Sequence, residues 1–298
     1  MNWNFNELRI GDEKQGIRDG DISDFNKTHY KSIVRESIQN SLDAKSKKSD
    51  KPVIVHFNLK TYPKDFLPNF SNIEKRIEKC FDYAKNDDDL EFLNTMIESF
   101  QNKSEYECME ISDYNTVGME VDTSYDSFAN SRNISNKDSK DSAGSKGMGK
   151  AAYFASSYLQ SILVSTKSVN DKVIFQGITK IANHNLDGKE YSHKGFYGNE
   201  MVPIQDEKLI PKDFRRIKVG TSIFIIGLKP DENRIENMTK ELLANFWLAI
   251  HEGDLVVKIN DKKFDNESIY NEIKSRYPHL EEKGQYNKFP NPRPYIET

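Results

Sequence analysis

A helix predicted over residues 28 to 47 has two faces of different character, and this combination constrains the fold more than any other feature of the chain. Apolar side chains recur at helical spacing on one face, at Tyr30, Ile33, Val34, Ile38 and Leu42. Such a face must be buried against another layer of secondary structure. Glu36, Asn40 and Asp43 follow one another at i, i+4 and i+7, so they share a second, polar face.

Apolar runs elsewhere predict strands on which this helix can pack. Strands are predicted at residues 53–59, 108–111, 161–166, 172–181, 221–228 and 255–259. Further helices are predicted as a pair within residues 73–100, and at about 147–157, 238–250 and 267–276. The first 26 residues are polar and broken by glycines. The stretch 120–145 is dominated by Ser, Asn, Asp and Lys and predicts a mobile loop.

Composition excludes several classes of protein. The 298 residues suffice for one large domain or two ordinary ones, and 17 Phe and 14 Tyr argue against general disorder. The formal net charge of -4 provides no overall attraction to nucleic acid. Cys80 and Cys108 make neither a zinc site nor a disulfide framework, so a reducing cytoplasm is expected. The chain starts without a signal-peptide core, and no apolar run approaches the roughly 18 residues of a membrane span.

The polar stripe of the first helix has an ordinary and a functional interpretation. Most such stripes are simply solvated. Alternatively, the carboxylate of Glu36 could orient and deprotonate a water molecule, and the amide oxygen of Asn40 could ligate a hard cation such as magnesium. The stripe alone does not decide between the two.

A second motif places an acidic residue at the end of a strand, in the run from Glu110 to Met119. Asp113 could accept a hydrogen bond from an exocyclic amine such as that of adenine, and Gly118 would let the backbone approach a ring closely. The alternative is an ordinary turn in which the Asp and Asn side chains bond to their own backbone.

The third motif is a glycine-rich loop that leads directly into a helix, from Gly144 to Lys150. Free amides at a helix start attract phosphate, although a flexible linker has similar composition. The loop also fits most of the P-loop pattern. Ala151 stands where that pattern needs Ser or Thr, and no apolar strand leads into the loop, so the P-loop interpretation is disfavoured. A fourth motif, Gly220-Thr221 at the start of a strand, means little alone.

Together these motifs resemble the GHKL, or Bergerat-fold, ATPases, the class that includes gyrase B, Hsp90, MutL and histidine kinases. The family pattern E-x-x-x-N-x-x-D-A matches residues 36–44. The pattern D-x-G-x-G-M is matched by residues 113–119 with one additional residue. The pattern G-x-x-G-x-G matches Gly144, Gly147 and Gly149, and the Gly-Thr strand matches residues 220–221. The similarity covers about residues 28–228.

The resemblance implies an α/β (α+β) two-layer sandwich, in which helices pack on one face of a mixed, mainly antiparallel sheet. It assigns an ATP-binding domain to residues 1–230, with a helical insertion at about 64–105 and an ATP lid at about 120–145. Residues 231–298 would form a C-terminal extension or the start of a transducer-like domain.

The resemblance also implies roles for single residues. Glu36 would be the general base, and Asn40 would ligate Mg²⁺. Asp113 would bind the adenine amino group, with support from Thr221 through water, and Met119 would pack on the base. The other positions expected to contact ATP are Asp43, Ala44, Lys47, Gly118, Gly144, Ser145, Lys146, Gly147, Met148, Gly149 and Lys150.

ATP and Mg²⁺ are therefore the expected cofactors. The resemblance implies homodimerisation on ATP binding and control of a protein effector or operon partner. The charge does not indicate DNA, and no membrane contact is expected. A histidine kinase is disfavoured, because no histidine precedes the ATP-binding motifs on a helical hairpin of its own. Residues 113–118 and 144–150 look similar to stand-alone bacterial ATPases of anti-phage defence. A nucleotide sensor with little hydrolysis is the alternative function, and a P-loop NTPase is the less favoured one.

Overall fold

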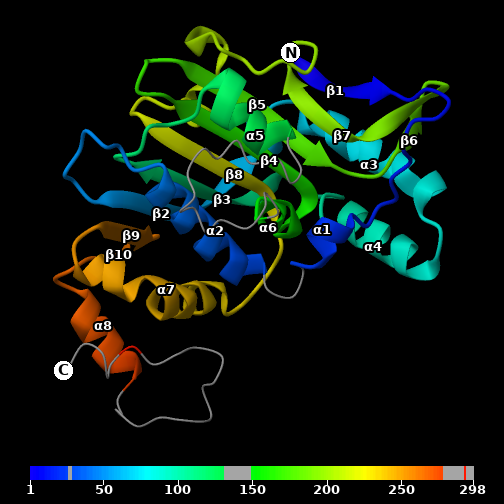
Figure 1. The fold of residues 1–298 in the computed structure, drawn as a ribbon. Helices are drawn as coiled ribbons and strands as arrows, with labels where there is room; N and C mark the ends of the chain where they lie inside the picture. Colours follow the sequence, from blue (N-terminus) through cyan, green and yellow to red (C-terminus); the bar gives the residue numbers. More distant parts are fainter. Residues whose placement is uncertain (26–28, 131–148, 278–291, 293–298) are drawn as a thin grey trace.

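The strands of the chain form one large sheet in the computed structural model, which describes residues 1–25, 29–130, 149–277 and Pro292. The described strands are β1 (Asn2–Glu7), β2 (Val53–Pro63), β3 (Glu105–Tyr114), β4 (Ser157–Lys167), β5 (Val173–Lys180), β6 (His184–Leu186), β7 (Lys189–Gly198), β8 (Gly220–Leu228), β9 (Leu255–Ile259) and β10 (Lys262–Phe264). Their order is β1-β7-β5-β4-β8-β3-β2-β9-β10, with β6 pairing on β7 (Figure 1). Among the described pairings, only β2 with β9 is parallel. The prediction of a mixed, mainly antiparallel sheet is confirmed.

Helices connect and cover these strands. They are α1 (Gly20–Ser23), α2 (His29–Asp43), α3 (Phe70–Glu78), α4 (Asp87–Glu98), α5 (Asp126–Asn130), α6 (Ala151–Ala155), α7 (Arg234–His251) and α8 (Ile269–Arg276). The predicted helix at residues 28–47 corresponds to α2, and its apolar face is buried as expected. None of the described helices is long and apolar enough to cross a membrane.

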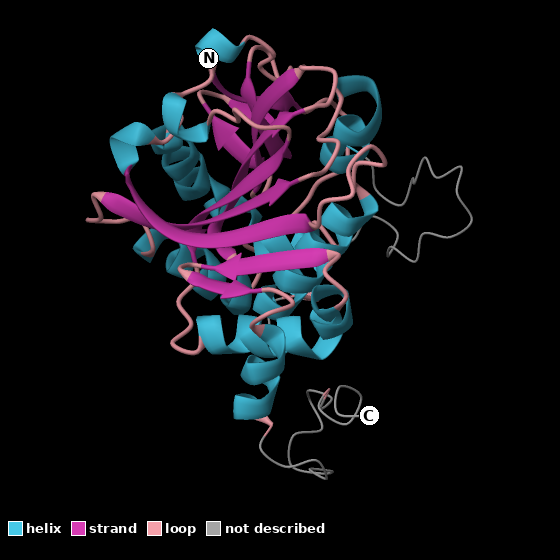
Figure 2. Cartoon of the chain, turned by 90° about the vertical axis from the view of Figure 1, so that its left-hand side faces the viewer, coloured by secondary structure: helices cyan, strands magenta, loops and turns pink. Residues whose placement is uncertain are grey.

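Both faces of the sheet are buried at its centre, which corrects the expectation of helices on one face only. Along β8, Ile223 and Ile225 belong to one core, whereas Phe224 and Ile226 belong to the other. The first core lies under α2, α6 and α7, and the second lies under α3 and α4, so helices flank the strands on both sides (Figure 2). Because both faces are apolar, β8 reads as a continuous hydrophobic run rather than an alternating one.

The helices of the second face come from the insertion expected at about residues 64–105. Ile73 and Ile77 of α3 are fully buried, as is Leu93 of α4. They share their core with Phe175 of β5. The insertion therefore covers the sheet and is not an appendage to it.

The polar start of the chain forms β1, which the sequence did not predict. Trp3 and Phe5 are buried and point to the second core. Glycines across the sheet make room for these rings: a Cβ on Gly177 would lie 2.4 Å from the Trp3 ring, and one on Gly195 would lie 2.3 Å from the Phe5 ring. The Trp3 indole N–H donates to the carbonyl of Pro68 at 2.8 Å.

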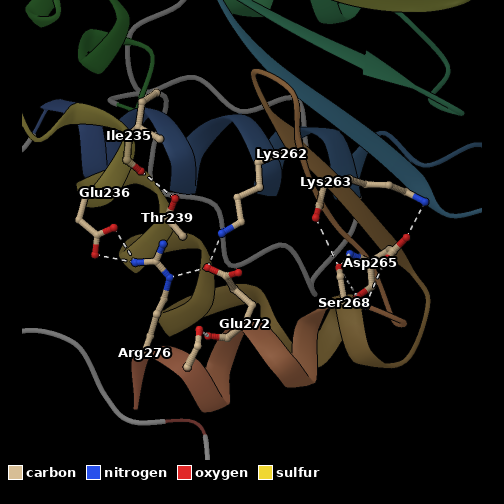
Figure 3. A network of polar contacts seen from close by, with 10 residues as sticks. Ile235, Glu236, Thr239, Lys262, Lys263, Asp265, Ser268, Glu272 and Arg276 are labelled. Atoms are coloured by element: carbon tan, nitrogen blue, oxygen red, sulfur yellow. Dashed lines mark hydrogen bonds and ion pairs between the residues drawn. The ribbon is translucent and has the colours of Figure 1, made fainter. Parts of the chain in front are cut away.

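The described residues after 230 continue the same sheet and core. β9 pairs with β2, and α7 lies against α2 (Figure 1). Polar contacts tie α8 to this layer (Figure 3). Arg276 bonds Glu236 of α7 at 2.6 Å and Glu272 of its own helix at 2.6 Å, and Lys262 of β10 also contacts Glu272 at 2.6 Å.

A buried histidine joins the insertion to the sheet and makes the stability of the fold dependent on pH. Arg76 of α3 lies 2.7 Å from His184 Nε2, and His184 Nδ1 lies 3.1 Å from the carbonyl of Ala182. Because a guanidinium can only donate, Nε2 must accept, and Nδ1 must carry the proton. Burial lowers the pKa of His184 from 6.5 to about 4.

We expect the free energy of unfolding to fall by up to about 3 kcal/mol as pH drops from 6.5 towards 4 on account of His184. The folded pKa is depressed, so the unfolded state takes up the proton first and is favoured at lower pH. Urea unfolding at pH 7 and pH 4.5 measures the fall in the free energy of unfolding. His184→Gln should remove the share of this fall that His184 causes. If the variant shows the same pH dependence as the wild type, His184 is not its cause.

Candidate functional site

The polar face of α2 meets the start of α6 at Glu36. A Cβ on Gly149 would lie 1.7 Å from Glu36 Oε2 and 1.9 Å from its Cδ, so the carboxylate packs directly on the glycine backbone. Gly149 is buried, and Glu36 is half-buried. The structure therefore brings the first motif against the end of the third, and only glycine leaves room for that contact.

Tyr153 of α6 is a member of this cluster that the sequence analysis missed. Its hydroxyl lies 3.2 Å from Ser37 Oγ and interacts with Asn40, and the charges of Glu36 and Asp113 act on it. Burial raises the pKa of Tyr153 to about 12, so it remains a neutral hydrogen-bonding group. In the helix predicted at about residues 147–157, Tyr153 stands four residues after Gly149, and this spacing was the signal available in the sequence.

Asp113 lies at the end of β3 and uses its two carboxylate oxygens differently. Oδ1 accepts hydrogen bonds from the Thr221 amide at 2.8 Å and from Thr116 Oγ1 at 2.6 Å. Oδ2 faces Ser41 Oγ of α2 at 3.5 Å, beyond ordinary hydrogen-bond length. Burial raises the pKa of this carboxyl, an effect that the bonds from Thr116 and Thr221 oppose. Oδ2 therefore retains most of its capacity to accept a hydrogen bond.

A second hydroxyl supports the same corner of the site. Thr166 of β4 pairs in register with Thr221, and their hydroxyl oxygens lie 3.0 Å apart. Thr166 Oγ1 also lies 2.9 Å from the Met119 amide, which donates to it. The second and fourth motifs are thus joined through Thr166, which the sequence analysis did not single out.

The remaining predicted site residues have different surroundings in the structure. The carbonyl of Ala44 accepts from the Val117 amide at 2.9 Å, so the end of α2 is fixed to the loop after β3. Asn40, Asp43 and Lys47 are exposed. Lys150 turns towards α5, where its ammonium bonds the carbonyl of Phe128 at 2.8 Å. Gly144, Ser145, Lys146, Gly147 and Met148 lie outside the described residues, as does most of the expected lid.

The described residues contain no cluster of three or more His, Cys, Asp or Glu side chains that could hold a metal ion. The side chain with a suitable hard oxygen beside Glu36 and Tyr153 is the amide of Asn40.

Replacing Gly118 with alanine should destabilise the fold by about 2–5 kcal/mol, because strain and overlap add at this position. Gly118 has a φ of 70°, and a Cβ there would lie 2.2 Å from the carbonyl oxygen of Lys167. Urea unfolding measures the loss. Gly11→Ala is the matched control: Gly11 has a φ of 98° but no atom within 4 Å of the added Cβ, so it reports strain alone, about 1 kcal/mol. Equal losses in both variants would show that the Lys167 contact is unimportant.

Comparisons with protein-family models and with curated proteins give no match for this chain.

Proposed function

We propose that this chain is a magnesium-dependent ATPase of the GHKL type, with the Bergerat arrangement of sheet and helices. The observation that carries the proposal is the packing of the Glu36 carboxylate on the backbone of Gly149. It puts an acid next to the glycine-rich segment that would wrap phosphates. Further along the same helix, Ser41 faces the half-buried Asp113.

The Asp113 end would bind the adenine base. Thr221 and Thr116 occupy Oδ1, which fixes the carboxylate plane, and Oδ2 is directed to the side of α2. An adenine amino group donating to Oδ2 fits this acceptor. Met119, anchored through its amide to Thr166, would pack on the base. Thr221 would support the base through water.

The Glu36 end would position the terminal phosphate and its attacking water. Asn40 would hold Mg²⁺ together with phosphate oxygens, and the ion would neutralise phosphate charge. Glu36 would accept the proton of the attacking water. Tyr153 interacts with Asn40 and Ser37, and it would fix the orientation of the α2 side chains. Since phosphoryl transfer depends mainly on positioning and charge, this small set of groups suffices.

The cellular role follows from the resemblance in the motifs. ATP binding would drive homodimerisation and control a protein effector or an operon partner, in a cytoplasmic system of the anti-phage defence kind. The alternative is a nucleotide sensor that binds ATP and hydrolyses little of it.

The test is release of inorganic phosphate from ATP by the purified chain, with Mg²⁺ and with EDTA. The proposal predicts turnover that requires Mg²⁺. Tight ATP binding without turnover would favour the sensor, and neither binding nor turnover by a folded chain would contradict both functions.

Asn40→Ala should remove most of the dependence of ATP affinity on Mg²⁺, because the ion would lose its side-chain ligand. Titrations of the variant and the wild type with and without Mg²⁺ measure this. An unchanged magnesium effect would mean that Asn40 is not a ligand. Gln39→Ala, a change to the neighbouring amide of α2, should leave the magnesium effect intact.

A further inference from the structure

Arg216 is a buried cation close to the end of the site where Asp113 lies. Its side chain is 6% exposed, and it belongs to the segment that joins Phe214 to β8. Phe214 anchors this segment in the second core, where its ring packs edge-on against Phe224 with centroids 5.0 Å apart. Burying a guanidinium is unfavourable unless its N–H groups are bonded and its charge is balanced. The partners of Arg216 therefore indicate its role.

The guanidinium of Arg216 ties the end of β3 to the start of β8. Nη2 donates to the backbone carbonyl of Asp113. Nη1 donates to Ser222 Oγ at 2.9 Å, and Nε donates to the carbonyl of Lys218 at 3.0 Å. The guanidinium also lies over the Tyr114 ring, with Cζ 4.4 Å from the ring centroid. The strand ends that it joins are the two that fix the Asp113 carboxylate.

These contacts approach Asp113 from the face of the sheet opposite α2. Successive side chains of a strand point to opposite faces. Tyr114 follows Asp113, and Ser222 follows Thr221, so both side-chain partners of Arg216 lie on the face away from the carboxylate. The carboxylate itself faces α2, where Oδ2 is directed to Ser41. Arg216 would therefore act on a ligand at Oδ2 only through Asp113.

Gly220 leaves the space for this arrangement. Its φ is 129°, a backbone angle that favours glycine. A Cβ there would lie 2.5 Å from Arg216 Nη2, 2.5 Å from the Asp113 carbonyl oxygen and 2.6 Å from Asp113 Oδ1. The glycine of the fourth motif is thus required by the close approach of Arg216 to Asp113.

The charges of Arg216 and Asp113 stabilise each other. Burial raises the pKa of Asp113, and the bonds from Thr116 and Thr221 and the charge of Arg216 oppose this rise. Burial lowers the pKa of Arg216, and Asp113 is the charged group that opposes this effect most strongly. Tyr153 of α6 also faces Asp113, but its pKa of about 12 keeps it neutral. Without the charge of Arg216, Asp113 would stay protonated up to a higher pH.

We propose that Arg216 is a positioning residue for adenine recognition and acts on the base through Asp113. Its bonds fix the strand ends that carry the carboxylate, and its charge favours the carboxylate over the acid. The carboxylate is the form in which both oxygens accept hydrogen bonds. The inference rests on the proposed ATP site and adds to that site a residue that does not touch the nucleotide.

Titration of Arg216→Gln with a non-hydrolysable ATP analogue at pH 7 and pH 9 tests the proposal. Relative to the wild type, we expect the affinity to be at least about tenfold lower at pH 7. Part of this deficit should disappear at pH 9, because higher pH restores the carboxylate of Asp113. Arg215→Gln is the matched control: the neighbouring guanidinium bonds the carbonyl of Ile210 at 3.0 Å, and the variant should bind as the wild type does.

A double-mutant cycle with Asp113→Asn separates action through Asp113 from a general loosening of the fold. Asparagine does not ionise, so Arg216→Gln in that background should lower the affinity by less than about threefold. A deficit that is the same at both pH values and fully additive with Asp113→Asn would make Arg216 a structural residue only and would overturn the proposal.

The failure of this inference is distinguishable from failure of the ATP site. If the folded wild type binds no analogue, both are wrong. If Asp113→Asn weakens binding but Arg216→Gln binds as the wild type does at both pH values, only the role of Arg216 is wrong. Arg216→Gln removes buried donors and could unfold, in which case Arg216→Lys decides the outcome. Lysine keeps the charge without the planar set of donors, so weaker binding with the pH profile of the wild type is expected, and unchanged affinity would overturn the positioning role.

Discussion

Replacing Glu36 with glutamine is expected to lower the rate of ATP hydrolysis about 10²- to 10⁴-fold, while ATP affinity changes by less than about threefold. Glutamine keeps the size of the side chain and its packing against Gly149 but cannot accept a proton from water at neutral pH. Single-turnover hydrolysis and binding of a non-hydrolysable analogue separate the two quantities.

The matched control for this change is Glu98→Gln, which neutralises an exposed carboxylate at the end of α4. It should leave turnover unchanged. Similar rates in the wild type and Glu36→Gln would exclude Glu36 as the general base. A parallel loss of analogue binding in Glu36→Gln would instead make Glu36 a binding group.

Replacing Asp113 with asparagine is expected to weaken ATP binding about 10- to 100-fold and to reverse part of the preference for ATP over inosine triphosphate. An asparagine oxygen in the place of Oδ1 would still accept from Thr221 and Thr116. Its amide N–H₂ would then replace Oδ2 and oppose the adenine amine, but it could donate to the carbonyl oxygen of hypoxanthine. Competition titrations with both nucleotides measure the change, and an unaltered preference would contradict base recognition by Asp113.

The same variant should remain folded at pH 7. The pKa of Asp113 is raised by burial, so its ionised form is disfavoured in the folded chain relative to the unfolded one. The raised pKa contributes stability that is fully present when the pH is below the pKa of Asp113 in the unfolded chain, about 3.9. This contribution is lost as the pH rises through the pKa of Asp113 in the folded chain. Asparagine resembles the neutral form, but it removes the charge that attracts the buried guanidinium of Arg216, so we expect a small loss of stability beside the larger loss of ATP affinity. Unfolding of Asp113→Asn in urea checks it.

Local patterns in the sequence identified much of the fold, and long-range packing decided the rest. The periodicity of α2 and the apolar run of β8 were sufficient to predict both elements, since each pattern repeats within one element. β1 was missed because the burial of Trp3 and Phe5 depends on Gly177 of β5 and Gly195 of β7, which lie far from β1 in the sequence. The second covered face was missed because the resemblance implied helices on one side.

Some residues of the candidate site could likewise be predicted from local patterns, and others could not. Glu36 and Asp113 could be selected from spacing and position, and the structure brings each against a residue of another predicted motif. Thr166 could not be selected, because its role depends on its register with Thr221, and register is a property of the paired strands. Lys47 stays a prediction for the pocket: α2 ends at Asp43, and Lys47 lies in an exposed turn beyond it.

Calorimetric titration of the folded chain with a non-hydrolysable ATP analogue, with and without Mg²⁺, tests the central claim most directly. The account predicts one site per chain, tighter binding with Mg²⁺, and weaker binding in Asp113→Asn. Absence of binding to a well-folded chain, or binding that neither Mg²⁺ nor Asp113→Asn alters, would contradict it.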